Sequence, residues 1–399
     1  MVGAGPGGVA AAVSLVRAGL KVVMVDKARF PRDKCCGDGL TTAALRNLER
    51  LGLDPGAVPS WQVVKTIRAR SPGGSTATME LPRDQGAYAA VARRIHLDAA
   101  LVDLARSHGV AVWEGTGLAT LSPTGGPNGV VIGLSTGQSV KADYVIGADG
   151  AWSALRRLAG EADEDGYRGE WHAFRQYFEG VGPSARDLWI WMEVDLLPGY
   201  AWSFPLPDGR ANVGMAILRR PGQPVGFMGQ VWEGLPQRDH IADVLGSGCR
   251  AEGRHLAWPI PARIGRSSLG GLGGRVLFVG DAARAGDFMT GEGIDQALHT
   301  GVLAGRAIAE AGPHRPGQAL VTYSKSIAST MAADHRMSEL VSRALSRPWA
   351  VNGAIRLAGS RPGIATRAGR WLFEDEPRAI VATPRRWHRQ FLSRPGAFR

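Results

Sequence analysis

The chain has few cysteines and lacks any long apolar run. Its three cysteines, Cys35, Cys36 and Cys249, are an odd number among 399 residues, and two of them are adjacent. This is a poor framework for disulfides and favours a reducing compartment. No apolar run reaches the roughly 18 residues that cross a membrane, and the N-terminus leads into a glycine-rich turn instead of a signal peptide. These absences predict a cytoplasmic protein.

The composition is otherwise ordinary but basic. A hydrophobic content of 44% with 21% charged residues is typical of a globular protein with room for two or three domains. The net charge is +11, yet no helix-turn-helix, zinc-finger or RNA-binding signature accompanies it, so we predict no nucleic-acid partner. We also predict no metal site.

Basic residues are spread along the chain, with one cluster at the C-terminus. We predict a solvated or disordered tail there, with a peripheral contact to the inner face of the membrane as the alternative. The cluster comprises Arg378, Arg385, Arg386, His388, Arg389, Arg394 and Arg399, interleaved with Trp387, Phe391, Leu392 and Phe398.

The chain begins with a G-x-G-x-x-G loop that runs into an apolar helical pattern. Gly3 permits the tight turn, Gly5 removes the side chain that would keep a pyrophosphate away from the backbone, and Gly8 lets helix and sheet approach closely. N–H groups at the helix start would hold the anion. Residues 21–26 predict a buried strand that ends on Asp26, at the distance expected of a ribose-binding carboxylate. We predict a dinucleotide site, and this pattern alone fits either NAD or FAD. The loop consists of Gly3, Ala4, Gly5, Pro6, Gly7 and Gly8.

Only two residues, Met1 and Val2, precede this loop. A central first strand normally needs about five residues. We therefore expect the natural chain to begin several residues earlier, and a shortened strand is the alternative.

Helices and strands alternate through the rest of the chain, without internal repeats or low-complexity segments. A loop rich in proline, glycine and charge covers residues 27–40. Hydrophobic periodicity and turn residues place the other elements. We predict helices at 41–52, 93–108 and 293–311, a hairpin of strands at 61–70 and 75–81, strands at 110–114, 116–122, 129–135, 143–147 and 275–279, an aromatic-rich antiparallel sheet within 171–220, and helices from 316 to 373 broken near Pro348 and Pro362.

Four motifs spread over nearly the whole chain resemble the geranylgeranyl reductase family of FAD-dependent oxidoreductases. They are the loop at Gly3–Gly8 with Asp26, the pair Asp149-Gly150, the pair Gly280-Asp281, and the segment Gly199–Pro205. The resemblance implies an α/β fold with a discontinuous Rossmann-like FAD-binding domain, an inserted mixed α+β substrate domain, and a helical C-terminal region. The FAD-binding domain would comprise residues 1–60, 85–165 and 265–315, the substrate domain 61–84 and 166–264, and the C-terminal region with its basic tail 316–399.

The resemblance also implies roles for single residues. Asp26 would hold the adenosine ribose, Arg94 would contact the adenosine or pyrophosphate side, and Asp281 would bind the ribityl chain. Asp149 would buttress the cofactor region. Residues 290–294 would place N–H groups of a helix N-terminus near the flavin pyrimidine edge, where they would stabilise the charge that builds on reduction. The implied cofactor-binding set is Gly3, Gly5, Pro6, Gly7, Gly8, Asp26, Lys27, Cys36, Gly37, Arg94, Asp149, Gly280, Asp281, Gly291, Gly293 and Ile294.

Residues 30–40 resemble the family's loop with a Cys-Gly-x-Gly core, which borders the flavin. Cys36 matches the family cysteine, and Cys35 stands where the family usually has proline. This pair leaves open an adjacent-cysteine disulfide. For Cys36, a role in gating or proton supply and a role as a small packed residue both remain open.

The segment at residues 198–205 resembles the reductases' Tyr-x-Trp-x-Phe-Pro signature. On a strand, Tyr200, Trp202 and Phe204 share one face. Three aromatic side chains in a row form an apolar wall that suits a long isoprenoid. We predict Cys36 and these three residues as catalytic. Phe288 stands where the family often has proline, and its bulk beside the flavin is expected to reshape the pocket.

The resemblance implies reduction of C=C bonds in a geranylgeranyl or polyprenyl substrate by hydride transfer from flavin N5. The alternatives are an FAD-dependent monooxygenase that hydroxylates a hydrophobic natural product, and a carrier of prenyl lipids that keeps FAD structurally. Cys36, Tyr200 or a bound water would supply the proton. No second G-x-G-x-x-G follows a strand, so NAD(P)H would dock transiently, and ferredoxin or another protein is the alternative electron donor.

Overall fold

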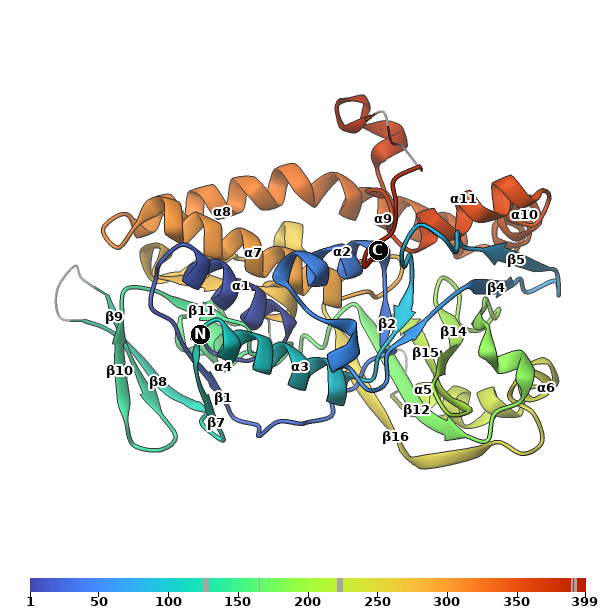
Figure 1. Ribbon diagram of the computed structural model, residues 1–399, viewed down its shortest axis with the longest axis horizontal. Helices are drawn as coiled ribbons and strands as arrows, with labels where there is room; N and C mark the ends of the chain where they lie inside the picture. The colour runs from blue at the N-terminus through green and yellow to red at the C-terminus, as the bar shows by residue number, and fades with distance from the viewer. Residues whose placement is uncertain (125–128, 165, 221–224, 389, 391–392) are drawn as a thin grey trace.

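The computed structural model describes all residues except 125–128, 165, 221–224, 389 and 391–392 (Figure 1). The glycine-rich loop follows Val2, which lies in the middle of a layer of mostly parallel strands. Val2 pairs in parallel with Val25 on one side and Gly147 on the other. A single residue therefore joins the two halves of this layer, in the place where a central strand was expected. The strands on either side of Val2 are β1 (Val23–Asp26) and β7 (Ala111–Glu114), and β11 (Val145–Gly147), β18 (Val276–Phe278) and β17 (Gly270–Gly271).

Two helices that cover this layer touch through small residues. A Cβ atom at Gly301 would lie 2.3 Å from the carbonyl oxygen of Gly7, and one at Gly305 would lie 2.8 Å from Cβ of Ser14. These helices therefore contact each other at the backbone, which only glycine permits at such distances. They are α1 (Pro6–Arg17) and α7 (Ile294–Ala311), with α2 (Thr42–Leu51), α3 (Arg94–Ser107) and α8 (Pro316–Thr330) beside them.

A three-stranded antiparallel sheet extends from this region in the order β10-β9-β8. The predicted strands at 116–122 and 129–135 are confirmed, but one strand of this sheet was missed. Residues 139–142 alternate polar and apolar side chains, but this edge strand has only four residues and no buried side chain, which is too little to identify it from the sequence. The strands are β8 (Leu118–Pro123), β9 (Val130–Leu134) and β10 (Ser139–Ala142), and the short helix α4 (Ala154–Leu158) follows β11.

A seven-stranded mixed sheet forms the other half of the molecule. Its order is β16-β12-β15-β14-β13-β4-β5, and β13 pairs with β4 in parallel. The predicted hairpin and antiparallel sheet are confirmed, and the hairpin strands join that sheet. The strand at 250–260 was missed because it is an edge strand with mostly exposed residues. The strands are β4 (Thr66–Arg70), β5 (Thr76–Glu80), β12 (Trp171–Glu179), β13 (Leu188–Trp191), β14 (Tyr200–Leu206), β15 (Arg210–Leu218) and β16 (Arg250–Ile260).

Smaller elements complete this half. Residues 61–65 do not extend the hairpin strand as expected, because Gln62–Val63 pairs with a different partner, β6. The helix α6 packs apolar side chains against one face of the seven-stranded sheet. The elements are β2 (Gly39–Leu40), β3 (Gln62–Val63) and β6 (Ala90–Val91), with the helices α5 (Val225–Gly234) and α6 (Asp239–Leu245).

The C-terminal region is helical, as predicted. Helices begin at Pro348 and Pro362, and a further break falls at Met331. Val351 and Ala365 pack against the apolar side of β4 and β5, which α10 and α11 cover (Figure 1). Within the described chain, no helix has the length and hydropathy needed to cross a membrane. The helices are α9 (Ala332–Leu345), α10 (Pro348–Ala358) and α11 (Pro362–Leu372).

The basic C-terminal residues fold back onto the body of the protein, so the prediction of a solvated or disordered tail is wrong for several of them. Arg378 is buried and donates to the carbonyl oxygens of Trp371 and Leu372. Arg386 donates to Asp334 at 2.8 Å. Their partners lie on or beside the C-terminal helices, which explains why a local charge pattern did not reveal them. Of the predicted cluster, Arg389, Phe391 and Leu392 lie outside the described residues.

Candidate active site

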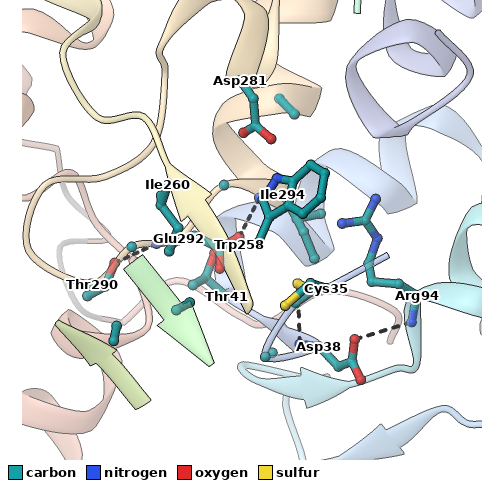
Figure 2. Close-up of a pocket in the computed structure, with 18 of the residues that line it drawn as sticks. Cys35, Asp38, Thr41, Arg94, Trp258, Ile260, Asp281, Thr290, Glu292 and Ile294 are labelled. Carbon is teal, nitrogen blue, oxygen red and sulfur yellow. Dashed lines mark hydrogen bonds between the residues drawn. The ribbon is translucent and has the colours of Figure 1, made fainter. Parts of the chain in front are cut away.

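A largely apolar pocket of about 230 Å³ lies between the glycine-rich loop, the loop at residues 34–39, β14 and the start of α7 (Figure 2). The structure brings most of the predicted site residues together here. Trp258 and Ile260 of the missed strand β16 also line it. The predicted residues that line the pocket are Gly5, Pro6, Gly7, Cys36, Gly37, Arg94, Tyr200, Trp202, Phe204, Gly280, Asp281, Gly291, Gly293 and Ile294, whereas Gly3, Gly8, Asp26, Lys27 and Asp149 lie outside its lining.

The glycines have the geometry of a phosphate cradle. Gly3 has a φ of +100°, and a Cβ atom there would lie 2.3 Å from the carbonyl oxygen of Ala148. A Cβ atom at Gly8 would lie 2.1 Å from the carbonyl oxygen of Gly3, whereas one at Gly5 would meet only Arg32, at 3.8 Å. No side chain caps the start of α1. Its first N–H groups therefore face open space, and an anion such as a pyrophosphate fits there.

The acids next to this loop are held by backbone donors. Asp26 accepts hydrogen bonds from the N–H groups of Ala4 and Ala28, both at 2.8 Å. Asp149 accepts one from Leu155 at 3.0 Å through Oδ2, while its buried Oδ1 has no partner among the described residues. Lys27 is exposed. Both carboxylates therefore shape the loops around the cradle.

Arg94 is buried at the pocket wall and is held by an acid that the sequence analysis did not assign. Its Nε and Nη2 atoms donate to the two carboxylate oxygens of Asp98, at 2.7 and 2.8 Å. Arg32 also contacts Asp98, at 2.8 Å. Two arginines share one carboxylate, so this wall carries a net positive charge that suits an anionic ligand. The sequence did contain a signal for this ion pair, because Arg94 and Asp98 are four residues apart on one helix.

Asp281 forms an ion pair within the protein itself. Its Oδ2 atom accepts from Nζ of Lys34 at 3.1 Å. Lys34 belongs to the loop that carries the adjacent cysteines, and both residues line the pocket. This ion pair ties that loop to the junction of β18 and α7.

The aromatic wall has the predicted arrangement. The ring centroids of Tyr200 and Trp202 are 5.8 Å apart, as are those of Trp202 and Phe204. The cysteine loop lies directly against the wall, because Cβ atoms at Gly37 and Gly39 would lie 3.3 Å from Trp202 and 2.8 Å from Phe204. The glycines of the Cys-Gly-x-Gly core therefore allow loop and wall to touch.

A buried polar network behind the wall was missed. The Trp202 Nε1 atom donates to Asn212 Oδ1 at 3.1 Å, and Asn212 Nδ2 donates to Asp38 Oδ2 at 2.8 Å. Tyr177 donates to the same carboxylate oxygen at 2.7 Å. Burial raises the pKa of Asp38 to about 6. Asn212 is a polar residue within a buried strand, and this was the signal that the sequence contained.

The two adjacent cysteines are free thiols. Burial raises the pKa of Cys35 to about 12 and that of Cys36 to about 11. Both side chains are therefore protonated at neutral pH, and the adjacent-cysteine disulfide is not formed in the structure.

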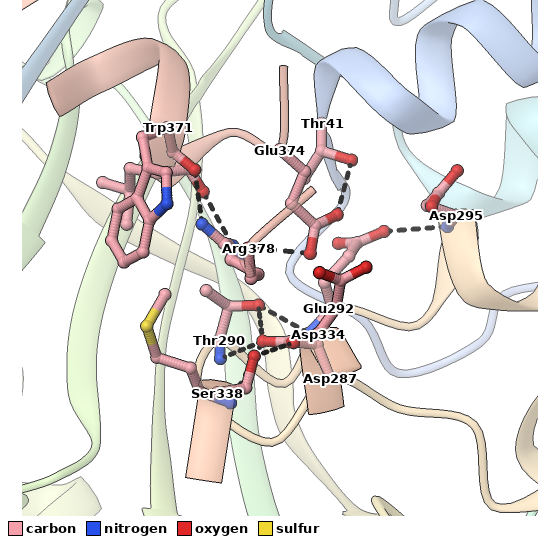
Figure 3. Close-up of polar contacts among 12 residues, drawn as sticks. Thr41, Asp287, Thr290, Glu292, Asp295, Asp334, Ser338, Trp371, Glu374 and Arg378 are labelled. Carbon is pink, nitrogen blue, oxygen red and sulfur yellow. Dashed lines mark hydrogen bonds and ion pairs between the residues drawn. The ribbon is translucent and has the colours of Figure 1, made fainter. Parts of the chain in front are cut away.

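The start of α7 differs from the expectation. The N–H groups of Ile294 and Asp295 donate to Oε1 of Glu292, at 2.9 and 3.1 Å (Figures 2 and 3). The Ile294 N–H group, predicted to face the flavin, is thus capped by a side chain. Burial raises the pKa of Glu292 to about 7. A residue within the predicted motif therefore contributes a titratable carboxyl group that the sequence analysis overlooked.

A polar cluster holds the loop that precedes α7 (Figure 3). Asp287 accepts from Ser338 at 2.6 Å and from the Thr290 hydroxyl at 2.8 Å. Glu374 accepts from the Thr41 hydroxyl at 3.2 Å, and burial raises its pKa. Thr41 and Thr290 line the apolar pocket, whereas Asp287 and Glu374 line a second, polar cavity of about 370 Å³. Hydrogen-bonded residues of this cluster therefore line both cavities.

Phe288 does not reshape the pocket, contrary to the expectation. Its ring packs edge-on against Trp171 and His335, with centroid distances of 6.1 Å in both cases. It does not line the pocket. The ring instead packs between Trp171 and His335 of α9, outside the lining of the pocket.

Fold and site together define a flavoprotein. Residues 1–195 match the family model described as FAD binding domain. The architecture is also that of solved flavoproteins: a halogenase in complex with FAD superposes with a TM-score of 0.69 at 15% identity, over 96% of this chain and 83% of the halogenase chain. The protein is therefore a flavoprotein that binds FAD.

The particular family follows from its relatives. The chain is 33% identical to menaquinone reductase of Mycolicibacterium smegmatis, over 78% of this chain and 76% of the relative. It is 32% identical to digeranylgeranylglycerophospholipid reductase of Methanothrix thermoacetophila, over 78% and 77%. A geranylgeranyl bacteriochlorophyll reductase-like protein from Thermoplasma acidophilum shares the fold, with a TM-score of 0.76 at 21% identity and 96% of both chains covered. The protein belongs to the geranylgeranyl reductase family of FAD-dependent oxidoreductases.

Replacing Gly3 with Ala is expected to lower both stability and FAD content. The added Cβ atom would clash with the Ala148 carbonyl oxygen at a backbone conformation that alanine rarely adopts. We expect the free energy of unfolding to fall by at least about 2 kcal/mol. We also expect the purified variant to contain less FAD per protein molecule, which the flavin absorbance after denaturation measures. Gly229→Ala is the control, since its Cβ atom would meet nothing within 4 Å. A fully loaded Gly3→Ala variant of unchanged stability would contradict this role of the turn.

Proposed function

We propose that the protein reduces C=C bonds of a geranylgeranyl or polyprenyl substrate. The observation that carries this proposal is the aromatic wall of Tyr200, Trp202 and Phe204, which lies in one apolar pocket with the phosphate cradle. Such a pocket can bind a long hydrocarbon by burying its surface, at roughly 25 cal/mol per Å². The names of the relatives, which denote reductases of menaquinone and of a digeranylgeranyl lipid, support the substrate class.

The residues fit FAD, and we assign them as follows. The open space at Gly5 and the uncapped start of α1 would hold the pyrophosphate, beside the arginine pair on Asp98. Asp281 would bind the ribityl chain and Asp26 the adenosine ribose. When bound, reduced FAD supplies a hydride from its N5 atom. We further propose residues 1–60, 85–165 and 265–315 as the FAD-binding domain, 61–84 and 166–264 as the substrate domain, and 316–399 as the helical C-terminal region.

The aromatic wall would orient the substrate and keep water away from it. An isolated double bond accepts a hydride poorly, so a proton must also be transferred to the neighbouring carbon, and positive charge develops on the alkene as that proton arrives. The ring faces of Tyr200 and Trp202 stabilise such charge by cation–π attraction. The hydrogen bonds from Trp202 through Asn212 to Asp38 fix the indole in position.

We propose Glu292 as the proton donor, because the other pocket carboxyl group with a raised pKa, Asp38, already accepts hydrogen bonds from Tyr177, Asn212 and the Arg94 N–H group. Burial raises the pKa of Tyr200 far above neutrality and that of Cys36 to about 11, so both are weak acids. The pKa of Glu292, about 7, lies near the working pH, where general acids are most effective. Its Oε1 atom accepts two helix N–H groups, and we assign the transferable proton to Oε2. The polar cavity behind Glu374 would return protons from solvent.

The electron donor is proposed to dock transiently at the protein surface. NAD(P)H and ferredoxin are the two candidates, because the chain has no second G-x-G-x-x-G after a strand. Steady-state assays with each donor would distinguish them.

The reaction is tested anaerobically. The flavoprotein is reduced chemically and mixed separately with geranylgeranyl lipids and polyprenyl quinones. We expect the flavin to be reoxidised by one of these classes, and mass spectrometry to show hydrogens gained in pairs. Product formation only when oxygen is present, with one oxygen atom incorporated, would contradict the proposal and indicate a monooxygenase. No substrate-dependent reoxidation would indicate a carrier.

A further inference from the structure

Two C-terminal helices expose large apolar side chains to solvent. Leu340 on α9 is 61% exposed, and Trp349 and Leu357 on α10 are 71% and 63% exposed. Exposed arginines lie on the same sides of these helices. Arg343 follows Leu340 by three residues on α9, and Arg356 follows Trp349 by seven residues, or about two turns, on α10. We call this surface the α9–α10 face and define it by Leu340, Arg343, Arg347, Trp349, Arg356 and Leu357.

The face carries strong positive charge. Residues 336–367 contain six arginines, all exposed, and a single acid, Glu339, which gives a net charge of +5. Glu339 lies near both His335 and Arg343 and is only 21% exposed. Arginines at the C-terminus differ, because Arg378 and Arg386 are engaged by partners within the protein. These helices therefore present a dense group of exposed arginines to an external anion.

The face is continuous with the apolar pocket. Leu345, at the end of α9, lines the pocket, as do Leu372 and Phe373 at the end of α11. Arg347 follows Leu345 by two residues and is exposed at the turn between α9 and α10. The pocket therefore reaches the C-terminal end of α9, two residues before the exposed Arg347 of this face.

We propose that the α9–α10 face docks on a lipid bilayer that carries anionic phospholipids. Trp349, Leu340 and Leu357 insert at the boundary between headgroups and acyl chains, while the arginines contact lipid phosphates. This combination of exposed apolar and basic side chains is typical of proteins that bind the membrane surface. Bilayer binding itself does not require the reaction, whereas passage of a prenyl substrate from the bilayer into the pocket rests on the proposed function.

The test is sedimentation of the FAD-loaded protein with vesicles. Vesicles of phosphatidylcholine alone are compared with vesicles that also contain phosphatidylglycerol. We expect binding to the anionic vesicles, and at least about a tenfold loss of binding in each of two triple variants, because every basic residue near an anionic surface and every inserted side chain contributes. The first combines Leu340→Ser, Trp349→Ser and Leu357→Ser, and the second Arg343→Glu, Arg347→Glu and Arg356→Glu.

Exposed positions elsewhere provide matched controls. Val194 is 64% exposed, and Val194→Ser should leave binding unchanged. The double variant Arg157→Glu and Arg186→Glu is the control for charge and should also leave binding unchanged, because both arginines are exposed on parts of the chain outside these helices. Thermal unfolding verifies that all variants fold.

Two results would overturn the proposal. Equal vesicle binding by the wild type and both triple variants would show that another surface binds lipid. A dimer in analytical ultracentrifugation that the apolar variant dissociates, without vesicle binding, would show that the face joins two copies of the chain. The vesicle assay contains no prenyl substrate, so failure of the proposed reaction would leave its result intact.

Discussion

Glu292→Gln is expected to slow the substrate-dependent oxidation of the reduced flavin by about 10²–10⁴-fold, the range that general acid catalysis contributes. The Gln side chain still accepts the N–H groups of Ile294 and Asp295, so the helix cap is kept. What it loses is an acidic proton. Anaerobic stopped-flow measurement of flavin absorbance at several pH values tests this directly.

The pH dependence identifies the role of Glu292. Its pKa is raised to about 7 in the folded protein, so the acid form is populated below this pH and lost above it. The wild-type rate should therefore fall as the pH rises through about 7, and this decline should be absent in Glu292→Gln. Glu310→Gln, an exposed change on α7, the helix whose start Glu292 caps, should behave as the wild type. A retained decline near pH 7 in Glu292→Gln would contradict the assignment.

Trp202→Ala is expected to impair turnover while FAD stays bound. The indole contributes a face for cation–π attraction, worth about 2 kcal/mol in a desolvated site, which corresponds to roughly a 30-fold slower reaction. It lies against Gly37 and Gly214 and is hydrogen-bonded to Asn212, so its loss leaves the phosphate cradle intact. Single-turnover kinetics and flavin content measure the two effects separately.

A second variant separates the ring from its hydrogen bond. Trp202→Phe keeps an aromatic face but cannot donate to Asn212, so it should retain most of the rate and show weaker control of substrate position. The Trp202→Ala variant also loses packing in a site that is 4% exposed, and its stability must be measured alongside. Unchanged alkene reduction in Trp202→Ala would count decisively against the proposed wall.

Features that depend on short sequence patterns could be predicted. The glycine-rich turn, the strand that ends on Asp26 and the helix that follows Gly293 each depend on neighbours within a few residues. The alternation in residues 200–204 likewise determined which rings share a face. These local rules, together with the family resemblance, indicated a mixed α/β fold, and most of the predicted site residues do line the pocket.

Contacts between distant segments could not be predicted. Asn212 and Asp38 are 174 positions apart, and their hydrogen bond exists only because β15 passes behind the cysteine loop. Arg386 similarly binds Asp334, 52 positions away, so its surface charge pattern was misleading. Glu292 was within a predicted motif, but its carboxyl group turned back on its own helix, and no pattern in the sequence distinguishes that conformation from one that faces the ligand.

The backbone contact between α1 and α7 has a consequence for electron transfer. Gly301 and Gly305 hold the two helices at a fixed spacing, and both helices begin at the same pocket. The start of α1, which no side chain caps, therefore presents peptide groups whose orientation is fixed by this packing, whereas the first N–H groups of α7 already bind Glu292. An environment that is already oriented has a small reorganisation energy, so electrons should enter and leave this site with little structural response from the protein.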